Sequence, residues 1–222
     1  MEKNRFLLVL SLFCLTFWHR AQAQVTSLVC NDLVFVSLDE DCAVTIKSEM
    51  VLEGGPYCCY DDYIVEFDKT APFGNGPWVQ GDLTKADVGK TYQVRITDPA
   101  SGNKCWGNIK AEDKLPAKLD CTGLTTVNLD ATGNATLLAS DVQVTATDAC
   151  SDPGQITFKI ANNQTSIQYT CSELGLQVLT VRATDAIGNT SSCQAAVLVA
   201  DPLNKCLGGC ATNCPPAQVV TY

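Results

Sequence analysis

Val181–Cys193 reads VRATDAIGNTSSC, and the fold follows from this stretch. Residues 179–184 alternate between apolar and polar side chains, which is the period-two pattern of a half-buried strand. The D-x-x-G-N segment at 185–189 carries turn chemistry, because Gly and Asn tolerate positive φ and Asp accepts hydrogen bonds from the amides of its own turn. A second alternating run, 194–199, follows. The stretch therefore predicts two strands joined by a tight turn.

The same pattern occurs earlier in the chain, at Val94–Cys105, which reads VRITDPASGNKC. Both copies contain V-R-x-T-D, then G-N, then a cysteine. An aspartate follows each copy, Asp113 after the first and Asp201 after the second. A motif that is used twice indicates two copies of one kind of domain.

Residues 1–23 have the organisation of a secretory signal peptide. Lys3 and Arg5 precede an apolar run, 6–17, and a small-x-small sequence follows at 21–23. The run is too short to cross a bilayer, and no later stretch is long and apolar enough, so we expect no membrane span in the mature chain. The sequence predicts a secreted, extracellular or cell-surface protein.

Cysteine content and charge narrow the class further. The chain has 13 cysteines, and removal of Cys14 with the signal leaves an even number, which favours a disulfide framework in an oxidising compartment. The net charge of -9 becomes more negative on cleavage, because three cations leave with one anion. Such an acidic chain repels nucleic acid and anionic lipid, so neither is an expected partner.

The length after the signal suits two domains. We expect the first at 24–118 and the second at 119–201, with the boundary at the DKLPAK segment, 113–118. Residues 202–222 are rich in Cys and Pro and are expected to form a linker and the start of a further, truncated domain.

Short alternating runs separated by turn signals predict an all-β fold of antiparallel sandwiches. One helical turn is expected at Leu83–Val88, with Thr84 as its cap and Asp87 three residues on. The expected strands are 33–38, 43–46, 63–67, 92–98 and 106–110 in the first domain, and 124–129, 135–138, 142–146, 156–160, 166–169, 177–184 and 193–199 in the second.

The motifs between Asp120 and Asp201 resemble those of the hyalin-repeat (HYR) family of immunoglobulin-like domains, especially the tandem versions in large bacterial surface proteins. The first domain keeps only the V-R-I-T-D…G-N-x-C end and looks like a divergent relative. The residues that carry the resemblance are Cys121, T-D-A-C at 147–150, C-S-E-L-G at 171–175, V-x-A-T-D-A-x-G-N at 181–189, Cys193 and V-x-V-A-D at 197–201. The fold that it implies is two tandem immunoglobulin-like β-sandwiches.

The resemblance also implies disulfides. The pairs that it implies are Cys121–Cys193 and Cys150–Cys171 in the second domain and, by position, Cys30–Cys105 and Cys42–Cys59 in the first. Cysteines whose partners spacing does not assign are Cys58, Cys206, Cys210 and Cys214. The tail cysteines suit disulfides that tether the tail better than thiolate metal binding, and Cys58-Cys59 suits two ordinary bridges better than a vicinal redox disulfide.

The composition argues against catalysis. The only histidine, His19, lies in the signal segment, so the mature chain cannot build a Ser-His-Asp site, a Cys-His site or a His-ligated zinc. Carboxylate-pair hydrolysis needs only two acids across a cleft. Its candidates are Asp61, Asp62 and Glu66, or Asp39, Glu40 and Asp41. Solvated acidic turns explain these residues better, so we expect no enzyme, no catalytic residues and no cofactor other than structural calcium.

Calcium is the metal that the sequence favours, because it takes carboxylate and carbonyl oxygens and rigidifies junctions between extracellular β-domains. The candidate ligands lie at strand ends or near domain boundaries: Asp98, Asp113, Asp148, Asp185 and Asp201. Turn formation alone also explains the T-D-x-x-G-N motif, and the sequence has no D-x-D-x-D-G loop.

Aromatic residues of the first domain offer a platform for a sugar or another ligand, with Trp78, Trp106 and Tyr60 as the candidates. The alternative role of such large side chains is to fill the core. Asn134, Asn163 and Asn189 each begin an N-x-S/T sequon, which is either a polar turn or a glycosylation site.

These observations predict a non-enzymatic, disulfide-braced structural or adhesion module of a cell-surface or matrix protein. Its expected partners are other extracellular proteins or itself, since exposed edge strands can pair between subunits into a fibre. The alternatives are a glycan- or calcium-dependent binding module, or an accessory region of an enzyme whose catalytic domain lies beyond Tyr222.

Overall fold

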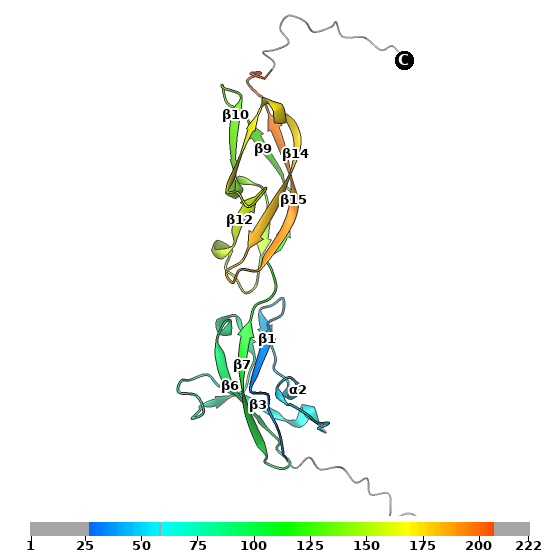
Figure 1. The fold of residues 1–222 in the computed structure, drawn as a ribbon, viewed down its shortest axis with the longest axis vertical. Coiled ribbons are helices and arrows are strands. Elements are labelled where there is room, and N and C mark those ends of the chain that lie inside the picture. Colours follow the sequence, from blue (N-terminus) through cyan, green and yellow to red (C-terminus); the bar gives the residue numbers. More distant parts are fainter. Residues whose placement is uncertain (1–26, 58, 207–222) are drawn as a thin grey trace, which may run out of the picture.

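The computed structural model describes residues 27–57 and 59–206. Their strands gather around two hydrophobic cores, one in a first unit, 27–112, and one in a second unit, 118–206. The two units lie one after the other along the long axis, joined by the linker, 113–117 (Figure 1). The expected signal peptide, Cys58, Cys210, Cys214 and the expected further domain lie outside the described residues.

The first unit is built on a five-stranded sheet in the order β1-β7-β6-β3-β4. Its strands are β1 (Leu33–Ser37), β3 (Ile64–Asp68), β4 (Trp78–Val79), β6 (Thr91–Thr97) and β7 (Lys104–Glu112). All neighbours pair antiparallel except β1 and β7, which are parallel. Alternate residues of β6 and β7, among them Val94, Ile96 and Ile109, are fully buried, as the period-two pattern predicts.

A shorter layer covers the inner face of this sheet. It contains β2 (Ala43–Val44), which pairs with β5 (Leu83–Thr84), the helix α2 (Ser48–Val51) and the 3₁₀ turns η1 (Tyr60–Asp62) and η2 (Lys85–Asp87). In η2, the Asp87 carboxylate accepts hydrogen bonds from the N–H and hydroxyl of Thr84. The helical turn predicted from the Thr84 and Asp87 spacing is therefore confirmed.

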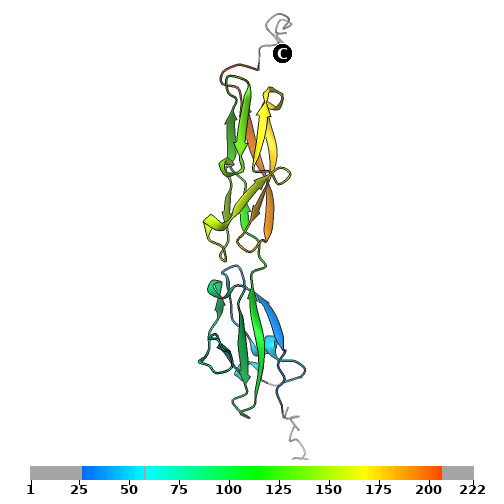
Figure 2. The same cartoon turned by 60° about the vertical axis from the view of Figure 1, so that its left-hand side comes forward.

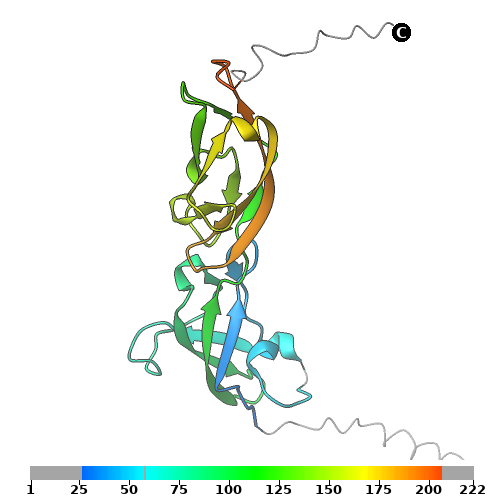
Figure 3. The ribbon, with the colours of Figure 1, turned by 45° about the horizontal axis from the view of Figure 1, so that its top comes forward.

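The second unit is a complete two-layer sandwich (Figures 2 and 3). One layer has the order β12-β14-β15-β9, and the other contains the pairs β10–β13 and β8–β11. The elements are β8 (Lys118–Asp120), β9 (Leu124–Asn128), β10 (Asn134–Leu138), η3 (Ala139–Asp141), β11 (Thr145–Thr147), η4 (Pro153–Gln155), β12 (Thr157–Ile160), β13 (Ser166–Thr170), η5 (Cys171–Glu173), β14 (Gly175–Thr184) and β15 (Thr190–Ala200).

The predicted hairpin is the centre of this sandwich. β14 and β15 pair antiparallel from Gly175–Val199 to Thr184–Thr190, and Val181 and Val197 are fully buried on their inner face. The predicted all-β, immunoglobulin-like sandwich is confirmed, with one addition. In each unit an early strand pairs parallel with the last one, β1 with β7 and β9 with β15.

Two strand predictions around β8 and β11 were inaccurate. The strand predicted at 142–146 starts only at Thr145, because the Gln143 N–H donates to the Thr125 hydroxyl at 2.8 Å instead of joining a ladder. The neighbouring Gln143 carbonyl occupies the space where a side chain at Gly123 would lie. The strand β8, which pairs with β11, was not predicted. It begins at the last residue of the predicted boundary segment and continues into the second unit.

Four disulfides brace the described part of the chain. Two of them join the same residues as the resemblance implies, Cys30–Cys105 and Cys121–Cys193. The other two differ: Cys42 is joined to Cys150, and Cys171 to Cys206.

The expected Cys42–Cys59 pair was wrong because Cys42 lies in the β1–β2 turn and is bonded to Cys150 of the second unit. Cys59 precedes η1, which packs against α2. The helix α2 lies away from the second unit (Figure 1).

The expected Cys150–Cys171 pair was wrong because its two members lie at opposite ends of the second unit. Cys150 adjoins the start of the β14–β15 turn, and Cys171 is bonded to Cys206, beyond the end of β15. A strand of 11 residues separates these ends by roughly 35 Å, whereas disulfide Cα atoms lie within about 7 Å.

Candidate functional site at the junction

The junction between the units is formed by the linker and three loops. The first unit contributes the β1–β2 turn, 39–42. The second unit contributes the 148–152 loop and the turn of the β14–β15 hairpin, 185–189. These loops come from distant parts of the sequence and meet around the linker, so the junction contains the contacts between the two units.

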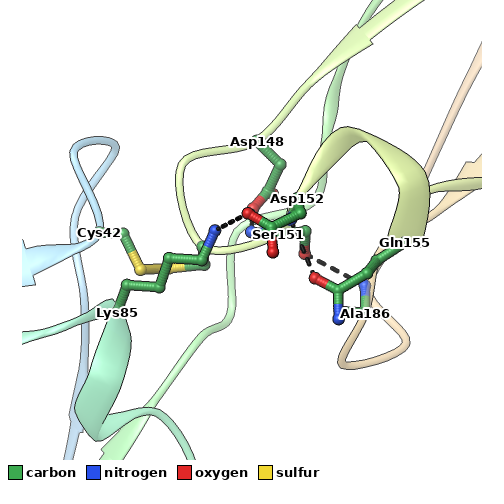
Figure 4. A network of polar contacts seen from close by, with 8 residues as sticks. Cys42, Lys85, Asp148, Ser151, Asp152, Gln155 and Ala186 are labelled. Carbon is green, nitrogen blue, oxygen red and sulfur yellow. Dashed lines mark hydrogen bonds and ion pairs between the residues drawn. A yellow bond between two sulfur atoms is a disulfide. The ribbon is translucent and has the colours of Figure 1, made fainter.

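A covalent bond crosses the junction. Cys42 and Cys150 are 108 residues apart and form a disulfide with a Cα–Cα distance of 5.1 Å (Figure 4). Asp39 shapes the turn that presents Cys42, since its carboxylate accepts hydrogen bonds from the N–H groups of Asp41 and Ala43. Cys150 packs against the core of the first unit. The second unit is thereby fastened to the first at a rigid point.

The T-D-x-x-G-N motif makes a compact turn. The Asp185 carboxylate accepts hydrogen bonds from the N–H groups of Ile187, Gly188 and Asn189 at 2.7–2.9 Å. Gly188 has a backbone φ of 103°, a conformation that residues with a side chain rarely adopt. Turn formation, one of the two readings of this motif, therefore describes its local geometry.

The same turn and the start of β15 form hydrogen bonds with the linker. The Asn189 side-chain amide donates to the carbonyls of Asp113 and Leu115 at 3.2 and 3.3 Å. The Ser191 hydroxyl donates to the Ala117 carbonyl at 2.5 Å. Because the Asn189 nitrogen is committed to these bonds, the polar-turn reading of its sequon is favoured over glycosylation.

A further hydrogen bond orders the 148–152 loop. The buried Ser151 hydroxyl accepts a hydrogen bond from the Ala186 N–H at 3.1 Å, which ties this loop to the hairpin turn (Figure 4). On the surface, Lys85 of the first unit pairs with Asp152 at 2.8 Å. Both side chains of that ion pair are largely exposed, so it adds little stability.

Acidic side chains converge beside the linker. A cavity of about 720 Å³ is lined by Asp39, Glu40, Asp113 and Asp148, with Lys118 as its one basic residue among the described residues. Asp113 is only 3 % exposed, and its carboxylate accepts one hydrogen bond, from the Leu115 N–H. Burial, followed by the negative charges of Asp148 and Asp185, raises the pKa of Asp113 above its ordinary value.

The structure brings three of the five candidate calcium ligands to this junction, Asp113, Asp148 and Asp185. Asp98 and Asp201 lie elsewhere. The Asp98 carboxylate accepts bonds from Ser101 and Ala100 in its own turn, and these bonds lower its pKa. Asp201 likewise accepts bonds from the backbone of residues 205 and 206.

The aromatic candidates separate into two locations. Trp106 is half exposed on the outer face of β7, opposite Arg95 of β6. The Arg95 guanidinium stacks 4.2 Å from the Trp78 ring centroid and pairs with Glu66. Tyr60 does not join this group, because it packs edge-on against Tyr57 and Tyr63 beside the core.

Sequence reasoning missed two serines of the junction, Ser151 and Ser191, and the Cys42–Cys150 pairing. The serines carry no motif. The role of Asn189 did have a sequence signal. An Asn follows Gly after T-D in both copies, which indicates a shared turn, and the side chain of that Asn can form hydrogen bonds with a neighbouring segment.

Comparison with known proteins adds fold likenesses only. No protein-family model matches the chain, and no curated protein matches it. Among solved structures, it is similar to the N-terminal four Ig domains of Dscam1 isoform 6.9, at 10% identity and a TM-score of 0.35, over 78% of this chain and 46% of that one. The chain thus spans less than half the length of that structure.

Two further similarities cover two-domain structures. One is human protocadherin-24 EC1-2, at 15% identity and a TM-score of 0.32, over 79% of this chain and 98% of that one. The other is titin A168169, at 14% identity and a TM-score of 0.31, over 79% of this chain and 100% of that one. Within residues 27–57 and 59–206, no helix has the length and apolar character needed to cross a membrane.

Proposed function

We propose that this chain is a secreted, non-enzymatic structural or adhesion module of a cell-surface or matrix protein, of the tandem HYR type. Its proposed parts are a signal peptide at 1–23, β-sandwich domains at 24–118 and 119–201, and a Cys/Pro-rich linker leading to a further domain at 202–222. The observation that carries the proposal is the junction, where the Cys42–Cys150 disulfide crosses from one unit to the other.

The junction supports a stiff spacer. A disulfide alone is a single pivot, but the Asn189 and Ser191 side chains also bind the linker along its length, at residues 113, 115 and 117. Contacts at several separated points restrain bending in more than one direction. A stiff pair of β-units can hold another part of a protein at a fixed distance from a surface.

The adhesive part of the proposal rests on the outer face of the second unit. Here an apolar stripe, composed of Leu124, Leu176, Val178, Ala196 and Leu198, crosses β9, β15 and β14 in register. Val178 is 70% exposed and Leu176 is 66% exposed. Leu124 is also exposed, and Ala196 and Leu198 are half-buried between these side chains. Apolar patches of this kind are typical of protein-binding surfaces, so the stripe favours another protein, or a second copy of the chain, as the partner.

The stiffness is tested by NMR residual dipolar couplings, which give one alignment tensor for two units that move together and two tensors for units that move independently. We expect one tensor for the exported wild-type protein and two for the Cys42→Ser/Cys150→Ser double variant. Cys171→Ser/Cys206→Ser removes a disulfide away from the junction and serves as the control, with one tensor expected. Two different tensors in the wild-type protein would refute the stiff spacer.

A second candidate function is glycan binding by the Trp78–Arg95–Trp106 face of the first unit. The exposed Trp106 ring beside the Arg95–Glu66 pair combines an apolar surface with hydrogen-bonding groups, as sugar recognition requires. Glycan-array binding that is lost in Trp106→Ala and retained in Phe35→Ala, an exposed aromatic residue of the same sheet, would support it. A wild-type protein that binds no glycan would eliminate it.

A further inference from the structure

We propose that Asp113 and Asp148 form a site for one hard divalent cation, Ca²⁺, at the junction between the two units. This inference deepens the proposed spacer function, because the cation would join the linker to the second unit and add a third type of restraint to the disulfide and the hydrogen bonds.

The first observation is an unsatisfied carboxylate oxygen. Among the described residues, Asp113 Oδ2 is buried and has no hydrogen-bond partner. Other buried aspartates of the chain are well satisfied: the Asp68 carboxylate accepts bonds from the N–H groups of Thr70, Gly74 and Gly76. A buried acceptor without a donor costs free energy, so the fold leaves Asp113 in need of a positive partner.

Asp87 shows the other solution that this fold uses for a buried carboxylate. Its oxygens accept hydrogen bonds from Lys69, Tyr92 and Thr84, so a positive charge and several donors compensate its burial. Asp113 has neither a cationic neighbour of this kind nor a second donor among the described residues. Ion pairs of the described residues join neither Asp113 nor Asp148 to a lysine or arginine, although Lys118 lines the same cavity.

The second observation is that the nearest charges are also negative. An oxygen of Asp113 and an oxygen of Asp148 lie within 4.8 Å of each other, and Asp185 adds a further negative charge nearby. Like charges at this distance repel, and a cation between them reverses the sign of the interaction. Asp148 is also held in place, since its carboxylate accepts a hydrogen bond from the Ser151 N–H at 2.6 Å.

The donor set selects the type of cation. Carboxylate oxygens are hard ligands that suit Ca²⁺, and the adjoining cavity of about 720 Å³ has room for the water molecules that would complete its coordination. The Cys150 sulfur also lies within 4.8 Å, but it is bonded to Cys42 and offers no thiolate to a soft metal such as zinc. With few protein ligands, the affinity belongs to the range of extracellular modules, about 10⁻⁴–10⁻³ M.

The site is tested by calorimetric titration and thermal unfolding of the wild-type protein in CaCl₂ and in EDTA. We expect Ca²⁺ to bind with a Kd of about 10⁻⁴–10⁻³ M and to raise Tm. Asp113→Asn and Asp148→Asn should each weaken binding at least about tenfold and abolish the rise in Tm. Asp98→Asn and Asp201→Asn remove carboxylates that act within their own turns, and both should behave as the wild type does.

Asp113→Asn has a second expected effect, which shows whether the variant folds. In EDTA its Tm should equal or exceed that of the wild type, because the substitution removes a buried and uncompensated charge. A variant that is as stable as wild type in EDTA and insensitive to Ca²⁺ has lost the site and kept the fold. A large loss of Tm in EDTA would instead show that the Asp113 carboxylate is structural, which would overturn the proposal.

Three other outcomes would also overturn the proposal: no binding at several millimolar Ca²⁺, equal binding by Asp113→Asn and wild type, or an identical rise in Tm with NaCl at matched ionic strength, which would indicate a general salt effect. Dipolar couplings in EDTA separate this failure from failure of the spacer function. One alignment tensor without Ca²⁺ leaves the spacer intact even if the cation site is absent, and two tensors that Ca²⁺ does not merge refute the spacer.

Discussion

Asp113 and Asp201 follow the last strand of their units, yet their carboxylates have different surroundings. Asp201 closes a short turn and accepts hydrogen bonds from the N–H groups of Lys205 and Cys206. After Asp113 the chain enters the linker toward the next unit, and within the described part of the chain the Asp113 carboxylate accepts one hydrogen bond, from the Leu115 N–H. Equivalent residues of a repeat therefore acquire different chemistry from the direction that the chain takes after them.

Asp87→Asn should lower the free energy of unfolding by about 2 kcal/mol at neutral pH, because the carboxylate accepts hydrogen bonds from Lys69, Tyr92 and Thr84. Burial raises the pKa of Asp87, but the bonds from Thr84, Tyr92 and Lys69 outweigh it and hold the pKa below its ordinary value. The contribution of Asp87 is thus present above the ordinary Asp pKa and is lost as pH falls through the lowered pKa.

Urea unfolding of wild type and Asp87→Asn at neutral pH and at about pH 2 checks this sign, since the difference between the two proteins should shrink in acid. The expectation fails if the difference grows as pH falls. Burial, followed by the hydrogen bond to Asp87 and its negative charge, raises the pKa of Tyr92 to about 12. Phenolate absorbance should therefore show one tyrosine that titrates later in wild type than in Asp87→Asn.

Gly107→Ala should destabilise the first unit by about 1–3 kcal/mol, the usual cost of overpacking a core. A Cβ at this position of β7 would collide with the Asn31 carbonyl, and that atom is backbone, which cannot move aside as a flexible side chain could. Gly154→Ala is the matched control, because a Cβ there meets nothing within 4 Å. Thermal unfolding of both variants measures the effect, and equal stability would contradict the close approach.

The same type of hairpin occurs in both units but has different contacts in each. The β6–β7 turn and the β14–β15 turn both use an aspartate that accepts hydrogen bonds from its own turn, Asp98 in the first and Asp185 in the second. The second turn also meets the linker through Asn189. The hairpin is thus a local structure, and its role as a docking surface comes from its neighbour.

Asn189→Ala should loosen the linker without unfolding either unit, because the side chain binds the carbonyls of residues 113 and 115 while most of the turn is held by Asp185. We expect amide hydrogen exchange to accelerate about tenfold around the linker and to stay unchanged in β14 and β15, which corresponds to losing about 1.4 kcal/mol of local stability.

Asn134→Ala is the matched control for this experiment, since the Asn134 amide bonds only to Thr132 within its own turn. It should leave exchange at the linker unchanged. Uniform acceleration throughout the second unit of Asn189→Ala would indicate that the turn supports the sandwich itself and would contradict a docking role.

For the whole molecule, two hydrophobic cores are joined by one covalent bond between distant residues. Among the residues that the structure describes, the cores of the first and second units share no buried residue, and Cys150 is the one residue of the second unit that packs on the first core. The units are therefore expected to be separate cooperative blocks that the junction couples.

Reducing that coupling should split the unfolding transition. A disulfide that closes a loop of about 100 residues restrains the unfolded chain by roughly 4–5 kcal/mol in the chain-entropy model. Calorimetry of Cys42→Ser/Cys150→Ser should show two transitions where the wild type shows greater overlap, with a lower Tm for at least one unit. Cys171→Ser/Cys206→Ser removes a disulfide within the second unit, so this control should lower the Tm of that unit and leave the Tm of the first unit unchanged. A single unchanged transition in the junction variant would contradict this coupling.

The apolar stripe predicts association. Val178→Glu places a charge among exposed apolar neighbours and should weaken self-association, or binding to a partner protein, by about tenfold or more. Thr180→Glu, on the same outer face of β14 beyond the stripe, is the matched control. Sedimentation velocity over a range of concentrations measures self-association. If the chain stays monomeric at every concentration, self-association is refuted and the remaining partner for the stripe is another protein.

Most features that depend on neighbouring residues could be predicted from the amino-acid sequence. Period-two alternation specified the strands and their buried faces, since a side chain's face follows from its position in the strand. D-x-x-G-N specified the hairpin turn because those residue types suit its backbone, and Thr84 with Asp87 specified a capped turn. The pairs Cys30–Cys105 and Cys121–Cys193 match what the family resemblance implies, and local sequence patterns did not assign them.

The contacts between the two units could not be predicted from the sequence and became visible in the folded structure. Cys42 pairs with Cys150, and Asp113 meets Asp148, because the ends of two sandwiches face each other across a short linker. The alternation of apolar and polar residues predicts which face of a sheet a side chain lies on. It does not predict which loops meet at the end of a sandwich. Contacts across a junction depend on how the two folded units are placed against each other, and that placement involves residues far apart in the sequence, such as Cys42 and Cys150.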